Sequence, residues 1–579
     1  MRVRLSVLMP LKNMGETFMS ALCRIALFVA SSMLAGAVMT IPSIAHDGDR
    51  DNDRCSGSRD VRLVNGKIHT LDKRNSIVSS VTIKNGRIVS VGDEGRSDDS
   101  SCMQVVNLGG RTAVPGLVDN HNHFLLLGLR PGHDTRLETA TSMADVQAAI
   151  RVRTKTVKPG QFITAMGGWT PAQFVENRFP TLAELDAAAP SNPVLVFNSF
   201  TGPAVTNTLG RNFFTGKGIT VDAVGNIAAN APSLAALNAL RAIQSFDDKK
   251  QGTLDAMAYS ASVGVTTNVD MGGFVIPGTP HTEASDQFDT LASWDPFTAY
   301  DPLLALYDEG KVSVRVRIFF LSMDHNPDVP LTTQRVLNAF SNFGDGMVRS
   351  SGIGEFATSW ALFGSPLPSN YIAALTIVAQ RGWAFQQHSL SLTEDMFSAG
   401  AFDTINKTIP IADLRWSVAH VPAIDQPTVN HLKAIGAGVA VHPFRYLSGG
   451  TGGGPPLRMI LDSGIHVGAG SDSAQISTLN PWNMIYYMVT GKNAGGKLVN
   501  SGQQITREEA IRLYTVNNGW FLKEEANLGS IEEGKFGDVV VLSDDYFNQV
   551  KVPDESIRKL HSVLTVINGK VVYNQLSSR

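Results

Sequence analysis

Residues 113–123 read AVPGLVDNHNH, an apolar run that ends in two histidines, His121 and His123. On an extended strand, side chains two positions apart point to the same side. Paired imidazoles are common ligands of zinc and related divalent ions, although a single histidine at a strand end is more often an ordinary loop residue. The segment therefore predicts a strand whose carboxyl end carries a metal site.

The middle of the chain, about 113–520, alternates apolar strand-like runs with helical stretches. The runs are 113–118, 162–166, 194–198, 265–269, 314–320, 352–356, 384–387, 416–419, 439–441 and 466–469. Continuous apolar runs are typical of parallel strands that helices cover on both faces. The alternation favours an α/β fold, either a barrel or a doubly wound sheet, and the runs number more than eight.

Further polar residues follow these runs at the positions where strands should end. His388, His420 and Asp472 each come directly after such a run or a few residues beyond it. In a (β/α)8 barrel the carboxyl ends of the strands form the active face, so these side chains can gather with His121 and His123. Imidazole and carboxylate suit zinc and related ions. His442 follows the run 439–441 and either faces the substrate or caps the strand end.

Both ends of the chain contain short strand-like segments with turn pairs between them. Asn65-Gly66 and Asn85-Gly86 in the N-terminal part, and Asn568-Gly569 in the C-terminal part, are hairpin signals. Each group is too small to form its own core. We therefore predict one composite β-sandwich built from residues 60–112 and 521–579, with the 113–520 domain inserted between them.

The first 45 residues resemble a secretory signal peptide, because basic residues precede the apolar stretch 25–39 and a small-residue Ser43-x-Ala45 site. An uncleaved membrane anchor is the alternative. Residues 46–59 are polar and are expected to form a flexible N-terminus. We predict an exported protein, periplasmic or secreted, or a membrane-anchored one if cleavage fails. Export would permit a disulfide between Cys55 and Cys102, but the sequence leaves that pairing open.

The amino-acid composition indicates which kinds of molecule the protein binds. The chain has 579 residues, 43% of them hydrophobic and 17% charged, with a net charge of -3. Such a chain can bury a large core, and it lacks the basic balance of nucleic-acid-binding proteins. We expect a small-molecule substrate, no nucleic acid and no stable membrane insertion after signal cleavage; a homo-oligomer is left open.

Taken together, the segment 113–123, the segment LGSIEEGKFGDVVVL at 528–542 and Gly470-Ser471-Asp472 resemble motifs of the amidohydrolase superfamily. The segments GGW at 167–169 and TLAELD at 181–186 resemble the branch that contains N-substituted formamide deformylase. The resemblance spans about 60–575. It implies a (β/α)8 TIM-type barrel with the composite β-sandwich.

The resemblance also implies roles for individual residues. His121 and His123 would hold one metal beside Asp472, while His388 and His420 would hold a second metal or contact the substrate. The cofactor would be one or two divalent ions, with zinc expected. A divalent ion lowers the pKa of bound water to ~7, and Asp472 would carry a proton from this water to the leaving amine.

Some residues depart from the pattern of the superfamily. Many members have a carboxylated lysine on the fourth barrel strand, but the segment 347–356, MVRSSGIGEF, contains none. Glu355 could bridge two metals as a native carboxylate, or form an ordinary ion pair. Pro203 replaces a histidine that is frequent in the branch, and Ser389-Leu390-Ser391 replaces its usual Gly-Asp. Both changes concern the substrate pocket, for which we expect contacts from Trp169 and His442.

The prediction is therefore a metal-dependent hydrolase that cleaves an amide or other non-peptide C–N bond through metal-activated water. Ester or lactone hydrolysis and deamination are alternatives on the same site, since an activated water serves all of them. A non-catalytic binding protein on a decayed barrel is a further alternative. The joint placement of the four histidines and Asp472 argues against it.

Overall fold

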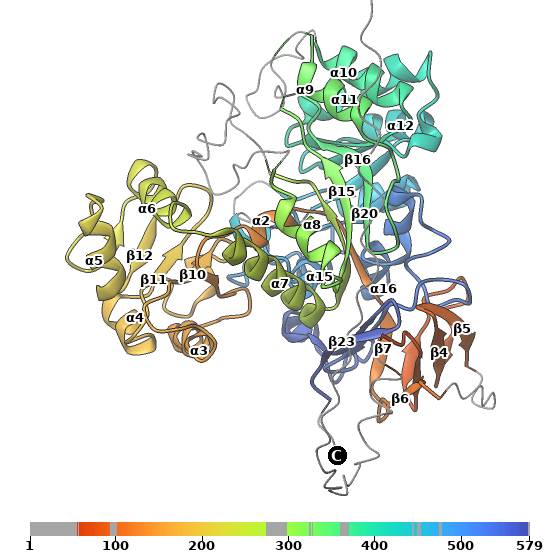
Figure 1. Ribbon diagram of the computed structural model, residues 1–579. Helices are drawn as coiled ribbons and strands as arrows, with labels where there is room; N and C mark the ends of the chain where they lie inside the picture. Colours follow the sequence, from red (N-terminus) through yellow and green to blue (C-terminus); the bar gives the residue numbers. More distant parts are fainter. Residues whose placement is uncertain are drawn as a thin grey trace, which may run out of the picture. The chain divides into compact units, whose positions relative to one another are not determined.

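A computed structural model describes residues 55, 57–92, 101–273, 298–323, 326, 328–358, 370–442, 445–448, 453–473 and 477–576 (Figure 1). Residues 55–579 form one compact unit. The predicted signal peptide and most of the predicted flexible N-terminus lie outside the described residues. Among the described helices, none has both the length and the apolarity needed to cross a bilayer.

Eight parallel strands form the central sheet, and their spatial order follows the chain. They are β8 (Leu117–Asn122), β14 (Val265–Asp270), β15 (Arg315–Phe320), β16 (Val348–Glu355), β17 (Ala384–Ser389), β18 (Ser417–His420), β19 (Gly438–Val441) and β20 (His466–Ala469). The first and last strands contact each other, and Asp472 N, just after β20, donates to His121 O of β8 over 2.8 Å. The sheet is a (β/α)8 barrel, so the predicted fold class is confirmed.

Helices follow the strands and cover the outside of the barrel. They are α2 (Phe124–Gly128), α7 (Phe246–Val263), α8 (Asp301–Asp308), α9 (Pro330–Asn338), α10 (Asn370–Gln380), α11 (Leu392–Asn406), α12 (Gln426–Ala434), α13 (Arg445–Ser448), α14 (Leu457–Ser463), α15 (Pro481–Thr490) and α16 (Arg507–Leu513). Short 3-10 helices occur at η4 (Ala412–Leu414), η5 (Val516–Leu522) and η6 (Asp554–Lys559). Ser245, Ser391 and Asp425 accept backbone N–H groups at the starts of α7, α11 and α12, which satisfies donors that a helix start leaves free.

A second α/β lobe is inserted after the first barrel strand. Its sheet contains β9 (His133–Asp134), β10 (Ile163–Met166), β11 (Val194–Phe197), β12 (Ala204–Thr206) and β13 (Asn226–Ile227). The lobe also contains α3 (Met143–Thr154), η1 (Pro171–Gln173), α4 (Leu182–Ala188), α5 (Thr208–Gly216) and α6 (Ala231–Arg241), whose ribbons surround these strands in Figure 1.

The inserted lobe contains two of the predicted strands. The runs 162–166 and 194–198 form β10 and β11 of its sheet, so both are confirmed as strands but neither belongs to the barrel. Both strands are fully buried, and their apolar pattern is the same as that of a barrel strand. Without these two runs, the sequence contains one apolar run for each of the eight barrel strands.

Two sheets built from the chain ends form the predicted composite sandwich. The four-stranded sheet contains β1 (Val61–Val64), β4 (Val81–Lys84), β5 (Arg87–Val91) and β6 (Gln104–Asn107). The six-stranded sheet joins β2 (Lys67–His69), β3 (Ile77–Val78) and β7 (Thr112–Pro115) to β21 (Val539–Leu542), β22 (Ser562–Ile567) and β23 (Lys570–Asn574). Leu63 and Ile83 from the first sheet share a buried core with Val539 and Leu564 from the second.

Two of the three predicted hairpin turns are confirmed, and one is not. Asn85-Gly86 joins β4 to β5, and Asn568-Gly569 joins β22 to β23, both as antiparallel hairpins. Asn65-Gly66 instead leads from β1 in one sheet to β2 in the other, so the hairpin predicted there was wrong. A turn pair sets local backbone angles but does not choose the partner strand.

Buried ion pairs tie the C-terminal segment to the barrel, and a disulfide closes a loop within the N-terminal segment. Arg315 of β15 donates from Nε to Asp538 over 2.6 Å, and Arg317 donates from Nε to Glu524 over 2.5 Å. Both arginines are fully buried, so these contacts fix the closing segment against the barrel. Cys55 and Cys102 form a disulfide with their Cα atoms 5.2 Å apart.

Candidate metal centre

The polar residues predicted for the metal site meet at the carboxyl ends of the barrel strands. His121 lies in β8 and His123 follows it, Glu355 ends β16, His388 lies in β17, His420 ends β18 and Asp472 follows β20. The side chains of His121 and His420 are at most 1% exposed, and that of His388 is 12% exposed. The structure thus brings together all six residues predicted as metal ligands.

One set of ligand atoms comes from His121, His123 and Asp472. Nε2 of His121 lies 3.6 Å from Oδ1 of Asp472, and Nε2 of His123 lies 3.4 Å from the same oxygen. The ligand atoms of these three residues all lie within 4.8 Å of one another. This spacing leaves room for an ion between atoms that are too far apart for direct hydrogen bonds.

A second set comes from Glu355, His388 and His420. Oε2 of Glu355 lies 2.6 Å from Nδ1 of His388 and 3.0 Å from Nε2 of His420. Glu355 also reaches the first set, because its Oε1 lies 3.4 Å from Nε2 of His123 and its Oε2 lies 3.6 Å from Nε2 of His121. Glu355 is therefore between the two sets and can contact both.

Backbone and amide carbonyls hold the first two histidines in place. Nδ1 of His123 lies 2.6 Å from the carbonyl oxygen of Gly272, and a carbonyl only accepts, so Nδ1 carries the hydrogen. Nδ1 of His121 bonds Oε1 of Gln386 in the same way. Both rings then turn Nε2 toward the centre, which is the arrangement that metal-binding histidines use.

The loop that carries Asp472 is fixed by a buried carboxylate that sequence reasoning missed. Asp119 accepts from Ser471 N over 2.9 Å, from Ser471 Oγ over 2.5 Å and from His121 N over 3.2 Å. Burial raises the pKa of Asp119 to about 6. Asp119 precedes His121 by two positions on β8, as Gln386 precedes His388 on β17, so the same alternation that singled out the histidines could have identified both.

The electrostatics of the centre favour a cation. Burial alone would raise the pKa of Glu355, but His388, His123 and His420 hold it well below its usual range. Burial opposes ionisation of Asp472 too, yet His420 and His121 lower its pKa strongly. Two ionised carboxylates among buried imidazoles need balancing positive charge.

The histidines show where protons compensate for that charge. Although burial disfavours a charged ring, Asp472 and Glu355 raise the pKa of His123 well above its ordinary value, and Glu355 raises that of His388. Burial and the neighbouring His388 lower the pKa of His420 to about 4. A divalent ion can replace the protons on His123 and His388, since imidazole binds metal in its neutral form.

The donor set fits a divalent metal. Nε2 of His121 is buried and has no hydrogen-bond partner among the described residues, and nitrogen and carboxylate oxygen are the donors that zinc and related ions prefer. His442, directly after β19, is fully buried and forms a third group of nearby ligand atoms with His121 and His420. Burial and the two neighbouring histidines lower the pKa of His442 well below its ordinary value.

Trp169 lies in the core of the inserted lobe, where it stacks on Phe174 at 5.8 Å between ring centres and is 2% exposed. A side chain at Gly168 would come within 3.4 Å of the carbonyl oxygen of Ser477, in the segment beyond Asp472. The lobe therefore contacts this segment. A substrate contact from Trp169 stays a prediction.

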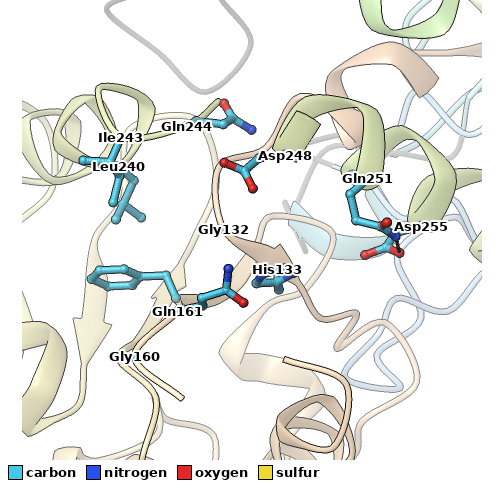
Figure 2. Close-up of a pocket in the computed structure, with 12 residues that line it drawn as sticks. Gly132, His133, Gly160, Gln161, Leu240, Ile243, Gln244, Asp248, Gln251 and Asp255 are labelled. Carbon is cyan, nitrogen blue, oxygen red and sulfur yellow. Dashed lines mark hydrogen bonds between the residues drawn. The ribbon is translucent and has the colours of Figure 1, made fainter. Parts of the chain in front are cut away.

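A different hollow lies between the inserted lobe and α7. Figure 2 shows its lining, which includes His133, Gln161, Asp248 and Asp255 around a volume of about 200 Å³. Asp248 accepts from Ser245 at the start of α7, and Asp255 pairs with Arg153. The lining contains none of the predicted site residues, so this hollow is separate from the metal centre.

Comparison with known proteins places the chain in a family. The model of the amidohydrolase family matches residues 104–573, and the chain belongs to this family, whose metal-dependent hydrolases cleave C–N bonds. It is 23% identical to N-substituted formamide deformylase of Arthrobacter pascens, over 90% of this chain and 99% of the relative. It is 24% identical to the protein LONG AFTER FAR-RED 3 of Arabidopsis thaliana, over 89% of this chain and 91% of the relative.

Solved structures show the same fold. An uncharacterized metal-dependent hydrolase from Pyrococcus furiosus superposes with a TM-score of 0.56 at 19% identity, covering 84% of this chain and all of its own. Atrazine chlorohydrolase from Arthrobacter aurescens, solved with zinc, superposes with a TM-score of 0.51 at 16% identity, covering 89% of this chain and 95% of its own.

Proposed function

We propose that this amidohydrolase cleaves the C–N bond of a small N-acyl or N-formyl compound. The observation that carries the proposal is the convergence of His121, His123, Glu355, His388, His420 and Asp472 at the active end of one barrel. A bound divalent ion supplies an activated water at neutral pH and polarises the substrate carbonyl. The name of the formamide deformylase relative supports the choice of substrate class.

We assign the ligand roles by position. His121, His123 and Asp472 would hold one ion, His388 and His420 a second, and Glu355 would contact both. Zinc is the proposed metal, supported by the nitrogen-rich donors. The zinc in the atrazine chlorohydrolase structure agrees with this choice.

Asp472 is the proposed proton carrier. Its carboxylate lies among the ligands, with Oδ1 3.6 Å from Nε2 of His121 and 3.4 Å from Nε2 of His123. It would take the proton of the attacking water and deliver it to the nitrogen that leaves. His442 and Trp169 are the proposed substrate contacts.

Export is a further part of the proposal. Residues 1–45 have the order of charges and apolar residues of a signal peptide. The disulfide between Cys55 and Cys102 supports an oxidising compartment, since disulfides are rare in the cytosol. We propose a periplasmic or secreted enzyme.

The decisive experiment measures metal and turnover together. Purified protein is analysed for metal content, stripped with a chelator, reloaded with zinc and assayed on N-formyl amines, N-acyl amines, carboxylic esters, lactones and aminopurines. We expect bound metal, and amide cleavage that is lost with the chelator and restored by zinc. Absence of metal together with no chelator-sensitive activity would overturn the hydrolase. Turnover confined to esters, lactones or aminopurines would overturn the assigned bond.

A further inference from the structure

Asp270 is a fully buried carboxylate at the end of β14 that belongs to neither set of candidate ligands. Its Oδ1 accepts a hydrogen bond from Leu125 N over 2.8 Å. Its Oδ2 accepts from Gly272 N over 3.0 Å and from the hydroxyl of Tyr300 over 2.8 Å. Leu125 lies in α2 and Tyr300 directly precedes α8, so one carboxylate joins the end of β14 to the starts of both helices.

Two of these contacts act on His123. Leu125 follows His123 by two positions, at the start of α2. Gly272 supplies the carbonyl oxygen that lies 2.6 Å from Nδ1 of His123. Asp270 therefore holds both the backbone that carries the ring and the residue whose carbonyl contacts the ring. The same carboxylate limits movement of His123 from two sides.

The turn at Gly272 is fixed by the side chain of Asp270. Gly272 has a φ of +65°, in the left-handed region that glycine adopts freely. An aspartate that accepts the N–H two residues further on closes a turn of this kind, and Asp270 does so. A Cβ at Gly272 would lie 3.1 Å from the hydroxyl of Tyr300, so Tyr300 lies directly against the turn. The direction of the Gly272 carbonyl thus depends on both side chains.

The position of the His123 ring is critical for metal binding. Its Nε2 lies 3.4 Å from Oδ1 of Asp472 and 3.4 Å from Oε1 of Glu355. Zinc binds an imidazole nitrogen at about 2.0–2.1 Å, so a ring that moves by a few tenths of an ångström loses contact with the ion. Groups that orient a ligand ring typically change metal affinity about 10–100-fold when they are removed.

We infer that Asp270 is a positioning residue of the metal centre. It holds the ring of His123 through Gly272 and Leu125, and Tyr300 holds the carboxylate of Asp270 in turn. The inference rests on the ligand role of His123 in the proposed function. Loss of the carboxylate then weakens metal binding even in a protein that keeps its fold.

Three variants remove the contacts in steps. Tyr300→Phe removes one hydrogen bond, Asp270→Asn replaces one accepting oxygen by an amide nitrogen, and Asp270→Ala removes all three bonds. Two matched controls lie away from the metal centre. Tyr486→Phe removes a hydroxyl that donates to Glu555 over 2.9 Å, and Asp186→Asn changes a carboxylate that accepts the first backbone N–H of α5.

Three measurements separate positioning from stability. Zinc affinity is measured by competition with a chromogenic chelator. The visible absorption spectrum of the cobalt-loaded protein reports the geometry of the ligands, since cobalt binds at the same nitrogen and oxygen donors. The Tm of the metal-free protein reports the stability of the fold without the ion.

We expect Asp270→Ala to bind at least one zinc ion about tenfold more weakly and to have an altered cobalt spectrum. This is the lower end of the range for groups that contact a ligand directly, because Asp270 acts through one further hydrogen bond. Asp270→Asn and Tyr300→Phe should show smaller losses, and both controls should match the wild type.

Wild-type zinc affinity and a wild-type cobalt spectrum in Asp270→Ala, whatever its Tm, would show a purely structural role and would overturn the inference. If Asp270→Ala does not fold, the same result in both Asp270→Asn and Tyr300→Phe would overturn it.

None of these measurements needs a substrate. A wild type that binds zinc but cleaves no compound of the screen would remove the proposed hydrolysis and leave the test of Asp270 intact. A wild type that binds no zinc would overturn both.

Discussion

Nδ1 of His388 lies 2.6 Å from Oε2 of Glu355. The same carboxylate lies 3.0 Å from His420 and 3.4 Å from His123, so it contacts both sets of candidate ligands. A native glutamate thus has the central position for which many related enzymes use a modified lysine. We propose that the number of ions at this centre, one or two, depends on this residue.

Replacing Glu355 by alanine should therefore remove one of two ions. We expect wild-type protein to bind two zinc ions per chain and Glu355→Ala to bind one, because the imidazoles of His388 and His420 lose the negative charge beside them. Elemental analysis after equilibrium dialysis measures this. Glu309→Ala, which removes a surface partner of Lys250, is the control and should bind the wild-type amount. Equal metal content in the two variants would exclude a bridging role.

Asp472→Asn should keep metal and lose turnover. The asparagine oxygen can still face the ion, but the amide cannot accept and return a proton, and loss of such a group costs about 10²–10⁴-fold in rate. Steady-state kinetics on the substrate found in the screen, together with metal content, measures this. Asp425→Asn, at the start of α12, is the control that should leave kcat unchanged. A rate near that of the wild type would remove Asp472 as the proton carrier.

Asp395 should make stability fall as the pH rises. It is fully buried, and burial raises its pKa from 3.8 to about 7. The folded protein then holds a proton that the unfolded chain releases, so the contribution of Asp395 to stability is fully present below pH 3.8 and is lost as the pH rises to about 7. That difference corresponds to about 4 kcal/mol at most.

Asp395→Asn removes this titration and keeps an oxygen for the hydroxyl of Ser389, which donates to Asp395 over 2.6 Å. The variant should have a higher Tm than the wild type at pH 8, with the difference vanishing near pH 4. Thermal unfolding across this range measures it. Asp403→Asn, on the same helix and paired with Lys407, is the control. A pH-independent difference would mean that Asp395 does not titrate in this range.

The disulfide should stabilise the protein without affecting the metal centre. It joins residues 47 positions apart, and closing loops of this size typically contributes about 2–4 kcal/mol to the free energy of unfolding. Replacing both Cys55 and Cys102 by serine should lower the Tm while kcat and zinc content stay at wild-type values. Dithiothreitol should lower the Tm of the wild type but not that of the double variant. A Tm equal to that of the wild type would show that the bond contributes nothing.

The sequence was most informative where the position of a residue along a strand decides where its side chain points. The alternation of side chains along a strand placed His121 and His123 on one side, and the end of each apolar run placed His388 and His420 at the active end of the barrel. The chain ends alone indicated a shared sandwich, because neither could bury a core of its own.

The sequence could not distribute strands among sheets. Residues Ile163–Met166 and Val194–Phe197 are as apolar and as buried as barrel strands, yet they pair with each other in the inserted lobe. The Asn65-Gly66 turn likewise did not reveal that β1 would pair with β4. Pairing depends on contacts between distant segments, which local patterns do not encode.

The sequence by itself thus determined the barrel class, the six residues that the structure gathers at the candidate metal centre and the motif that closes the sandwich. Only the tertiary structure decided that Glu355 contacts both ligand sets and that Nδ1 of His442 meets Nδ1 of His420. The physical reason is that a residue at the carboxyl end of a strand must lie at the active end of the barrel. Whether two such residues form a hydrogen bond depends on differences of a few tenths of an ångström in their distance. Those distances follow from the register of neighbouring strands, such as the pairing of His420 with Val441.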